Sequence, residues 1–291
     1  AGGALTLKSV VETSTKYSGV PDNQGRDNPA SKELDLVVSK GRKDAALFLN
    51  ASSGQIFIGE SGTELLFRMI SEACLNSVNS GRIVGSSLEH PASRSAAKRW
   101  AQISGLEYVE VPHNNITGTV TAIDYAAHID AQTVVATIIH TSPITGISVD
   151  ITAISRAIRE KAPDCFIIVD GIQHAAHGNI DIDLYDIDGY AISPYKVFSR
   201  HGFGIAWISD RFSTIPHNRL QGSPENNWEL GTRDPGSFAS ISNVVDYFEW
   251  LGEEIGGDHD RRTKILTAAG AIHEQEKNLT QALLHGAGNL K

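Results

Sequence analysis

Lys196 stands in the segment SPYKVFSRHGFGIAW, between the apolar runs YAIS and GIAWIS. An amine at the mouth of two buried strands is either a solvated loop residue or a reactive group. Asp170 ends the apolar run CFIIVD, 26 residues earlier. A carboxylate at that depth must be paired or hydrogen-bonded, because unpaired burial of a charge is costly. It is therefore either a structural cap or ion pair, or the acid that holds a positively charged ring nitrogen of a ligand.

The segment IFIGESGTELLFRMI predicts a strand, a tight turn and a helix that starts near Gly62 and Thr63. Gly62 would let the backbone approach a ligand closely. Free amides at the positive end of a helix suit a phosphate group. The simpler interpretation is that Ser61 or Thr63 only caps the helix.

Two further side chains could contact a flat cofactor ring. Gln173 could donate a hydrogen bond to a ring hydroxyl, and His90 could lie flat against the ring. Taken alone, Gln173 is more simply a surface turn residue and His90 a buried or capping histidine. Pyridoxal 5'-phosphate (PLP) requires a lysine for its aldehyde, an acid at its ring nitrogen and a phosphate cradle. The whole set therefore predicts a PLP site with Lys196 as the Schiff-base amine.

These candidates follow apolar runs that alternate with helix-like segments. Continuous Val- and Ile-rich runs of this kind are typical of a mostly parallel sheet with helices on both faces. The predicted strands are 56–59, 82–87, 108–111, 133–140, 165–170, 190–193 and 204–209. The predicted helices are 64–79, 93–103, 123–128 and 151–161, and helical periodicity returns in 237–256 and 258–285. Ligands bind at the carboxyl ends of parallel strands, so the candidates should converge on one cleft.

Composition narrows the class of partner. The chain has 291 residues and a net charge of −9, from 25 basic and 34 acidic side chains. This balance disfavours a nucleic-acid surface and a polybasic membrane patch, and no apolar run has the roughly 18 residues of a membrane span. Two distant cysteines, Cys74 and Cys165, predict neither a disulfide framework nor a zinc site. We therefore expect a cytoplasmic protein with a small-molecule substrate.

Four blocks of sequence carry a family resemblance. They read SLEHPASRSAAKRW, HTSPITGISVDITAISRAIRE, IIVDGIQHAAHGNIDIDLYDIDGYAISPYKVFSRHGFGIAW and WELGTRDPGSFASISNVVDYFEWLG. In this order they resemble the cysteine desulfurase-like, class V aminotransferase family of fold type I PLP enzymes. The resemblance implies a three-layer α/β fold, with an N-terminal arm over 1–35 and a PLP-binding large domain over 36–252. Residues 253–291 would be the helical start of a small C-terminal domain that is otherwise missing.

The resemblance also implies cofactor roles, position by position. Lys196 matches the Schiff-base lysine, and Asp170 matches the partner of the pyridinium nitrogen. Gln173 matches the partner of the ring hydroxyl, and His90 matches the ring-stacking histidine. The phosphate cradle is matched by Gly62, Thr63 and Ser193. Thr232, in ELGTRD, matches a threonine that reaches the phosphate of the neighbouring subunit. A homodimer is therefore expected.

Three features depart from the family pattern. Tyr195 precedes the lysine where the family often has histidine, although its hydroxyl can still donate a hydrogen bond. Pro143 stands where the family often has asparagine, so Ser142 or Thr145 would have to make that contact. The small domain would usually supply an arginine for the substrate carboxylate and, in desulfurases, a cysteine on a mobile loop.

The predicted function is a PLP-dependent enzyme that acts on an amino acid. A cysteine desulfurase-like lyase is favoured over a class V aminotransferase or an epimerase. Two alternatives belong to other classes. One is a metal-dependent hydrolase that uses Asp170, His174, His177 and Asp181. The other is a non-catalytic protein of the PLP fold that serves as a scaffold for a partner.

Overall fold

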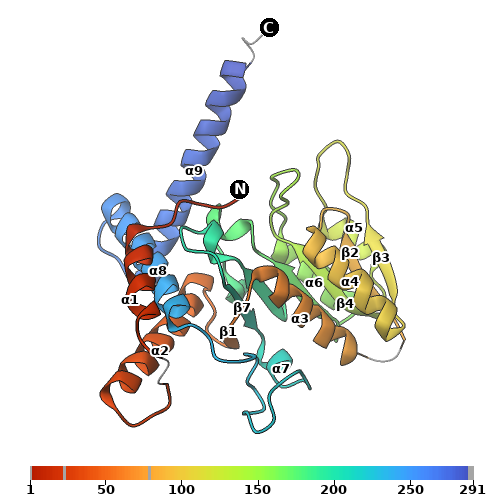
Figure 1. The fold of residues 1–291 in the computed structure, drawn as a ribbon. Helices are drawn as coiled ribbons and strands as arrows, with labels where there is room; N and C mark the ends of the chain where they lie inside the picture. The colour runs from red at the N-terminus through yellow and green to blue at the C-terminus, as the bar shows by residue number, and fades with distance from the viewer. Residues whose placement is uncertain (1, 22–23, 78–79, 288–291) are drawn as a thin grey trace.

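The sheet of the protein has seven strands (Figure 1). The computed structural model describes residues 2–21, 24–77 and 80–287. The strands are β1 (Gln55–Gly59), β2 (Arg82–Ser86), β3 (Glu107–Val111), β4 (Thr133–Ile139), β5 (Phe166–Asp170), β6 (Gly189–Ile192) and β7 (Gly204–Ile208). They lie in the order β1-β7-β6-β5-β4-β2-β3. Only β7 is antiparallel to its neighbours β1 and β6, so the predicted mostly parallel sheet is confirmed.

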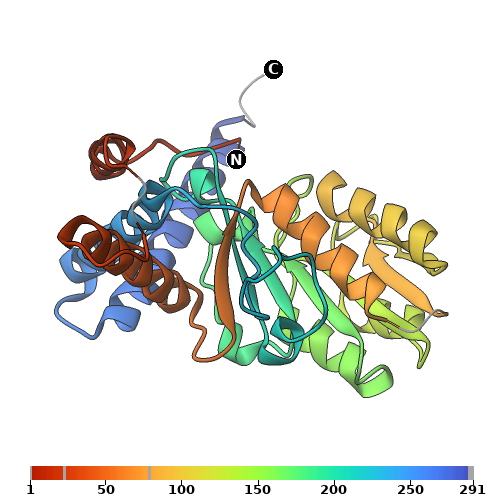
Figure 2. The same cartoon turned by 60° about the horizontal axis from the view of Figure 1, so that its bottom comes forward.

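Helices cover both faces of this sheet, as Figure 2 shows. They are α1 (Lys8–Ser18), α2 (Pro29–Leu49), α3 (Gly62–Leu75), α4 (Pro91–Ser104), α5 (Ala122–His128), α6 (Ile151–Lys161), α7 (Asp210–Ser213), α8 (Pro235–Gly256) and α9 (Arg261–Ala287). Side chains of α3 and α4 form one hydrophobic core against the sheet, and side chains of α2, α5, α6 and α8 form the other. The predicted three-layer architecture is thus confirmed.

The N-terminal region, predicted as an arm over 1–35, contains α1 and the start of α2. Asn28 caps α2 by accepting a hydrogen bond from the amide of Ser31, and a proline occupies the first turn. The predicted domain bounds after residues 35 and 252 fall inside α2 and α8. The division into domains stays a prediction.

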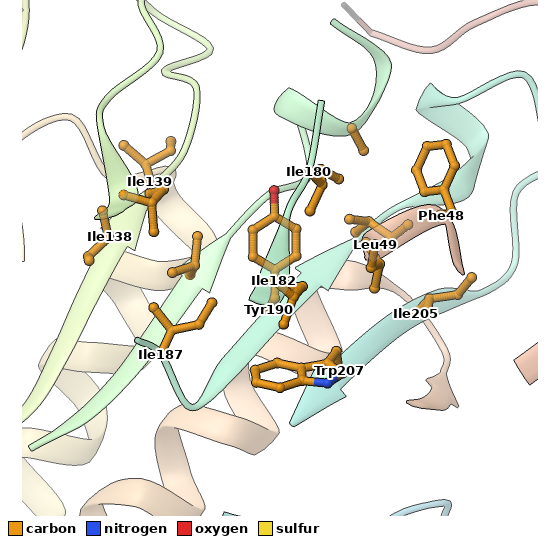
Figure 3. Close-up of a cluster of buried hydrophobic side chains, with 14 of the residues drawn as sticks. Phe48, Leu49, Ile138, Ile139, Ile180, Ile182, Ile187, Tyr190, Ile205 and Trp207 are labelled. Atoms are coloured by element: carbon orange, nitrogen blue, oxygen red, sulfur yellow. The ribbon is translucent and has the colours of Figure 1, made fainter. Parts of the chain in front are cut away.

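The alternation of side chains along β5 places the predicted acid. Ile167 and Val169 belong to the core under α5 and α6, whereas Ile168 belongs to the core under α3 and α4. Successive strand residues point to opposite faces, so Asp170 shares the α3/α4 face with Ile168. Figure 3 shows the other face, where Tyr190 stands among the isoleucines of the larger core.

The buried residues of the last helix, α9, lie in its first half. Ile265, Ala268 and Ala269 are buried there, and beyond them the helix projects away from the rest of the fold (Figure 1). Within the described ranges, no helix combines the length and the hydrophobicity that crossing a membrane requires.

Candidate active site

The sheet brings the predicted residues to one edge. The strands β1, β2, β4, β5 and β6 point in the same direction, so their carboxyl ends lie on the same side of the sheet. Asp170 pairs in register with Ile139 of β4 on one side and Ala191 of β6 on the other. Lys196 ends the short 3-10 turn that follows β6. The predicted acid and the predicted amine therefore follow neighbouring strands at the same edge.

Asp170 is a buried carboxylate with two neutral donors. Its side chain is 3% exposed; Oδ1 accepts a hydrogen bond from the amide of Ile172 at 3.0 Å and Oδ2 accepts one from Ser93 Oγ at 3.4 Å. Burial raises the pKa of Asp170, and the hydrogen bond from the amide of Ile172, together with the neighbouring His90 and Lys196, opposes that rise. A cation placed at this carboxylate would therefore be strongly favoured.

Lys196 is a buried amine. Its side chain is 8% exposed, and its Nζ forms no hydrogen bond or ion pair with the described part of the chain. Burial lowers the pKa of Lys196, while Asp170 acts in the opposite direction. Removal from water therefore favours the neutral, nucleophilic form of this amine.

The start of α3 faces the serine that follows β6. A β-carbon on Gly62 would lie 2.5 Å from Ser193 Oγ and 2.6 Å from Ile172 Cδ1, so only glycine fits there. Ser61 caps α3, because its Oγ accepts a hydrogen bond from the amide of Glu64 at 3.1 Å. The capping alternative thus holds for Ser61. Thr63 is exposed in the first turn, where the positive end of the helix favours an anion.

His90 caps α4, as the simpler interpretation proposed. Its Nδ1 accepts a hydrogen bond from the amide of Ala92 at 3.1 Å, which leaves Nε2 to carry the ring proton. The same residue lies close enough to Asp170 to lower the pKa of that carboxyl. Capping therefore fixes the ring beside the acid, and its stacking on a cofactor stays a prediction.

Gln173 and Ser142 line one cavity of about 630 Å³ between the loop after β4 and α9. Ser142 is buried, and its Oγ accepts hydrogen bonds from the amides of Ile144 and Thr145. Pro143 is exposed at the rim of this cavity. Ser142 therefore holds the turn and lines the same cavity as Gln173. Its substitution for the family's asparagine stays a prediction.

Tyr195 turns toward its own chain. Its ring stacks on His201 with centroids 4.1 Å apart, and its carbonyl accepts a hydrogen bond from the amide of Ala4. Lys196 Nζ lies 5.9 Å from the centre of the Tyr195 ring. A contact from the tyrosine hydroxyl to a phosphate stays a prediction.

Thr232 is exposed in the segment before α8. The next residue, Arg233, forms an ion pair with Glu60 of the turn between β1 and α3. Glu229, three residues before Thr232, accepts a hydrogen bond from the amide of Ile58 in β1. The segment therefore runs beside the β1–α3 turn of its own chain, and its contact with a second subunit stays a prediction.

The residues of the metal-hydrolase alternative have different partners. His174 Nδ1 lies 2.8 Å from Thr141 Oγ1, and its Nε2 donates to the carbonyl of Asn179. His177 pairs with Glu276 of α9, and Asp181 accepts a hydrogen bond from the side chain of Asn50. In the described ranges, no group of three or more histidine, cysteine, aspartate or glutamate residues is arranged to hold a metal ion. This geometry disfavours the hydrolase.

Three buried polar residues near this edge had no predicted role in a PLP site: Glu89, His140 and His174. Glu89 and His140 follow strands β2 and β4, and that position was the only signal that the sequence offered. Their burial and their partners become visible only once the strands are assembled.

Comparison with known proteins places this geometry in a family. The model of the class V aminotransferases matches residues 1–269. The cysteine desulfurase-like protein ustD of Aspergillus flavus is 27% identical over 271 residues, which cover 89% of this chain and 60% of that protein. A cysteine desulfurase of Salmonella newport is 24% identical over 241 residues, which cover 76% of this chain and 58% of the relative. The chain thus spans about 60% of the length of these two curated relatives.

Solved structures share the fold. A NifS-like protein has a TM-score of 0.83 at 18% identity, over 99% of this chain and 74% of that one. The apo cysteine desulfurase of Thermococcus onnurineus NA1 also has a TM-score of 0.83, at 20% identity, over 99% of this chain and 72% of that one. Because the family model matches residues 1–269, the chain belongs to the class V aminotransferase family of PLP-dependent proteins.

Proposed function

We propose that the protein is a PLP-dependent enzyme that acts on an amino acid as a cysteine desulfurase-like lyase. One observation carries the proposal. A buried amine, Lys196, and a buried carboxylate, Asp170, follow neighbouring strands and affect each other's pKa. The choice of a desulfurase over an aminotransferase or an epimerase is supported by the similarity to the cysteine desulfurase-like protein of Aspergillus flavus and the cysteine desulfurase of Salmonella newport.

The residues at this edge fit the cofactor. Lys196 offers a buried amine with a pKa lowered by burial, which suits bond formation with an aldehyde. Asp170 offers a buried carboxylate whose pKa is raised by desolvation, which a protonated ring nitrogen would relieve. Gly62 lets the start of α3 approach Ser193 Oγ closely. The amides at this helix start and the serine hydroxyl would together hold the phosphate.

When bound, PLP supplies an electron sink for the carbanion that forms at the substrate Cα. The chain's own residues prepare that chemistry. Asp170 would keep the ring nitrogen protonated, because a buried carboxylate strongly favours a cation at its side. Lys196 Nζ, with its pKa lowered by burial, would accept the proton from Cα and return it. His90 would cover one face of the ring, held in place by its cap on α4.

The proposal includes a homodimer in the cytoplasm. Thr232 is exposed, which leaves its hydroxyl available to the phosphate site of a second subunit. Both cysteines are free and buried, a state that suits a reducing compartment.

Reduction with borohydride tests the site directly. The chain is incubated with PLP, reduced and digested, and the peptides are mapped by mass spectrometry. We expect the pyridoxyl group on Lys196, and Lys196→Arg should abolish the adduct. An adduct on exposed Lys98 or Lys161 instead would contradict the site.

A panel of amino acids then separates the reactions. Release of sulfide from cysteine would support the lyase. Transfer of the amino group to an oxo acid would support the aminotransferase, and loss of the optical activity of the amino acid would support the epimerase. PLP bound at Lys196 with no turnover of any of these substrates would support the scaffold alternative.

A further inference from the structure

Glu89 is a second buried carboxyl group beside the proposed site. It follows β2, one residue before His90, and its side chain is 1% exposed. Oε1 accepts two hydrogen bonds, from the amide of Ile139 at 2.9 Å and from Ser86 Oγ at 3.0 Å. The other oxygen, Oε2, is fully buried and has no hydrogen-bond partner among the described residues. An ionised carboxylate with one oxygen in this state would be costly.

The surroundings of Glu89 contain hydroxyl groups around Gly85. A β-carbon on Gly85 would lie 2.4 Å from Thr137 Oγ1 and 3.6 Å from both Glu89 Cγ and Tyr108 Oη. Thr137 Oγ1 and Tyr108 Oη are also buried without a hydrogen-bond partner in the described part of the chain. Neutral hydroxyl groups, which can accept a hydrogen bond from a protonated carboxyl group, therefore lie around Gly85 together with the side chain of Glu89.

The titratable groups around Glu89 do not favour its negative charge. Asp170 of β5 repels that charge. Tyr108 of β3 and Tyr125 of α5 are phenols whose own pKa values are raised by burial and by Glu89. On α4, the cation Arg94 hydrogen-bonds to the carbonyl of Ser87 and acts on the pKa of Tyr108.

The two acids have unequal surroundings. Each oxygen of Asp170 accepts a hydrogen bond from a neutral donor, and Lys196 nearby opposes the rise in its pKa. Glu89 has only neutral donors, and burial together with the charge of Asp170 raises the pKa of Glu89 to about 8. Two ionised carboxylates in one buried site repel each other, so one of them retains a proton. Among the described residues, Glu89 Oε2 has no hydrogen-bond partner whereas both oxygens of Asp170 have one, so the geometry favours Glu89 as the acid that retains the proton.

We propose that Glu89 is a neutral carboxylic acid in the native protein, and that its proton leaves Asp170 as the single negative charge facing the cofactor ring. Glu89 is then a positioning residue. Its Oε1 holds the amide of Ile139, which pairs with Asp170 in the sheet. The link to the cofactor rests on the proposed function, whereas the protonation of Glu89 does not.

Infrared spectroscopy of the full chain in heavy-water buffer, first without cofactor, tests the protonation. We expect a stretching band of a protonated carboxyl group at pH 7 that weakens as the pH rises through about 8. The band should be absent from Glu89→Gln and retained in Asp170→Asn. It should also be retained in Glu160→Gln, the matched control, because Glu160 is an exposed acid on α6. No band that depends on Glu89 would overturn the proposal.

Glu89→Gln is also a test of folding. The amide keeps an acceptor for Ile139 and Ser86 and carries no charge, so it should fold if the native group is neutral. Failure of this variant to fold, while Glu160→Gln folds, would count against a neutral Glu89.

The PLP-loaded chain provides the second readout. In the native chain, the visible absorbance of bound PLP should change as Glu89 ionises near pH 8, because a second negative charge then arises beside Asp170. This change should be missing in Glu89→Gln and present in Glu160→Gln. The same alkaline change in Glu89→Gln would contradict the coupling. If the chain binds no PLP, the proposed function fails, and the infrared result still decides the state of Glu89.

Discussion

His140 and His174 stack face to face, with ring centroids 3.4 Å apart and ring planes 9° from parallel. His140 Nδ1 lies 2.7 Å from the hydroxyl of Tyr190, and His174 bonds to Thr141 and to the carbonyl of Asn179. Burial lowers the pKa of both histidines, that of His174 to about 4. Two positive charges could not occupy this stack, so the native protein contains a pair of neutral imidazoles.

This pair predicts a loss of stability in mild acid. In the unfolded chain the histidines take up protons below about pH 6.5, whereas folded His174 does so only near pH 4. The stabilisation is therefore fully present above about pH 6.5 and is lost as the pH falls toward about 4. Each such group contributes up to about 1.4 kcal/mol per pH unit in that range. Urea unfolding at a series of pH values measures this slope.

The variant His174→Gln should flatten the slope between pH 6.5 and 4.5, whatever its effect on the stability at pH 7. His285→Gln is the matched control, since His285 is exposed on α9 and should leave the slope unchanged. Equal slopes in the native chain and in His174→Gln would show that this histidine is not held neutral by the fold.

The architecture could be predicted where the chain is continuously apolar. The run 165–170 was predicted as a strand, and β5 occupies Phe166–Asp170. The helix α1 was missed because its sequence is polar and only Val10 is buried. The antiparallel direction of β7 was not predicted either, because the identity of a strand's neighbours depends on tertiary pairing and not on its own residues.

The candidate site divides in the same way. Asp170 and Lys196 could be predicted because Asp170 ends one apolar run and Lys196 lies three residues after the next, and a polar residue in such a place needs an explanation. The neutral state of Glu89 could not be predicted, because it depends on the amide of Ile139 from another strand and on unpaired hydroxyl groups across the sheet. The stacking of His140 and His174 could not be predicted either, because the two residues are 34 positions apart in the sequence.

Asp170→Asn should separate the electronic role of the acid from the binding of the cofactor. The neutral amide cannot hold the ring nitrogen protonated, while Lys196 and the cradle of Gly62 and Ser193 are unchanged. We expect PLP to remain bound and exchange of the substrate Cα proton to slow by at least about 10²-fold, as when a preorganised electrostatic group is removed. Proton exchange followed by NMR in heavy water measures this rate.

Asp164→Asn is the control for that experiment, because Asp164 is exposed in the turn before β5. It should retain both the cofactor and the rate of exchange. An undiminished rate in PLP-loaded Asp170→Asn would show that the acid serves only the structure.

The two cysteines should be inert in the native protein. Cys74 lies in the last turn of α3 at 2% exposure, and burial raises its pKa to about 12. Cys165 precedes β5, at the opposite end of that strand from Asp170; it is 1% exposed, and burial raises its pKa well above the usual value. Since the thiolate is the nucleophile, neither residue can accept sulfur from a substrate at Lys196. We expect almost no reaction of the native chain with a thiol-specific disulfide reagent, and two reactive thiols per chain after unfolding in urea.

The double variant Cys74→Ser, Cys165→Ser should keep whatever amino-acid chemistry the native chain has. Loss of sulfide release in a folded double variant would place one of these thiols in the mechanism.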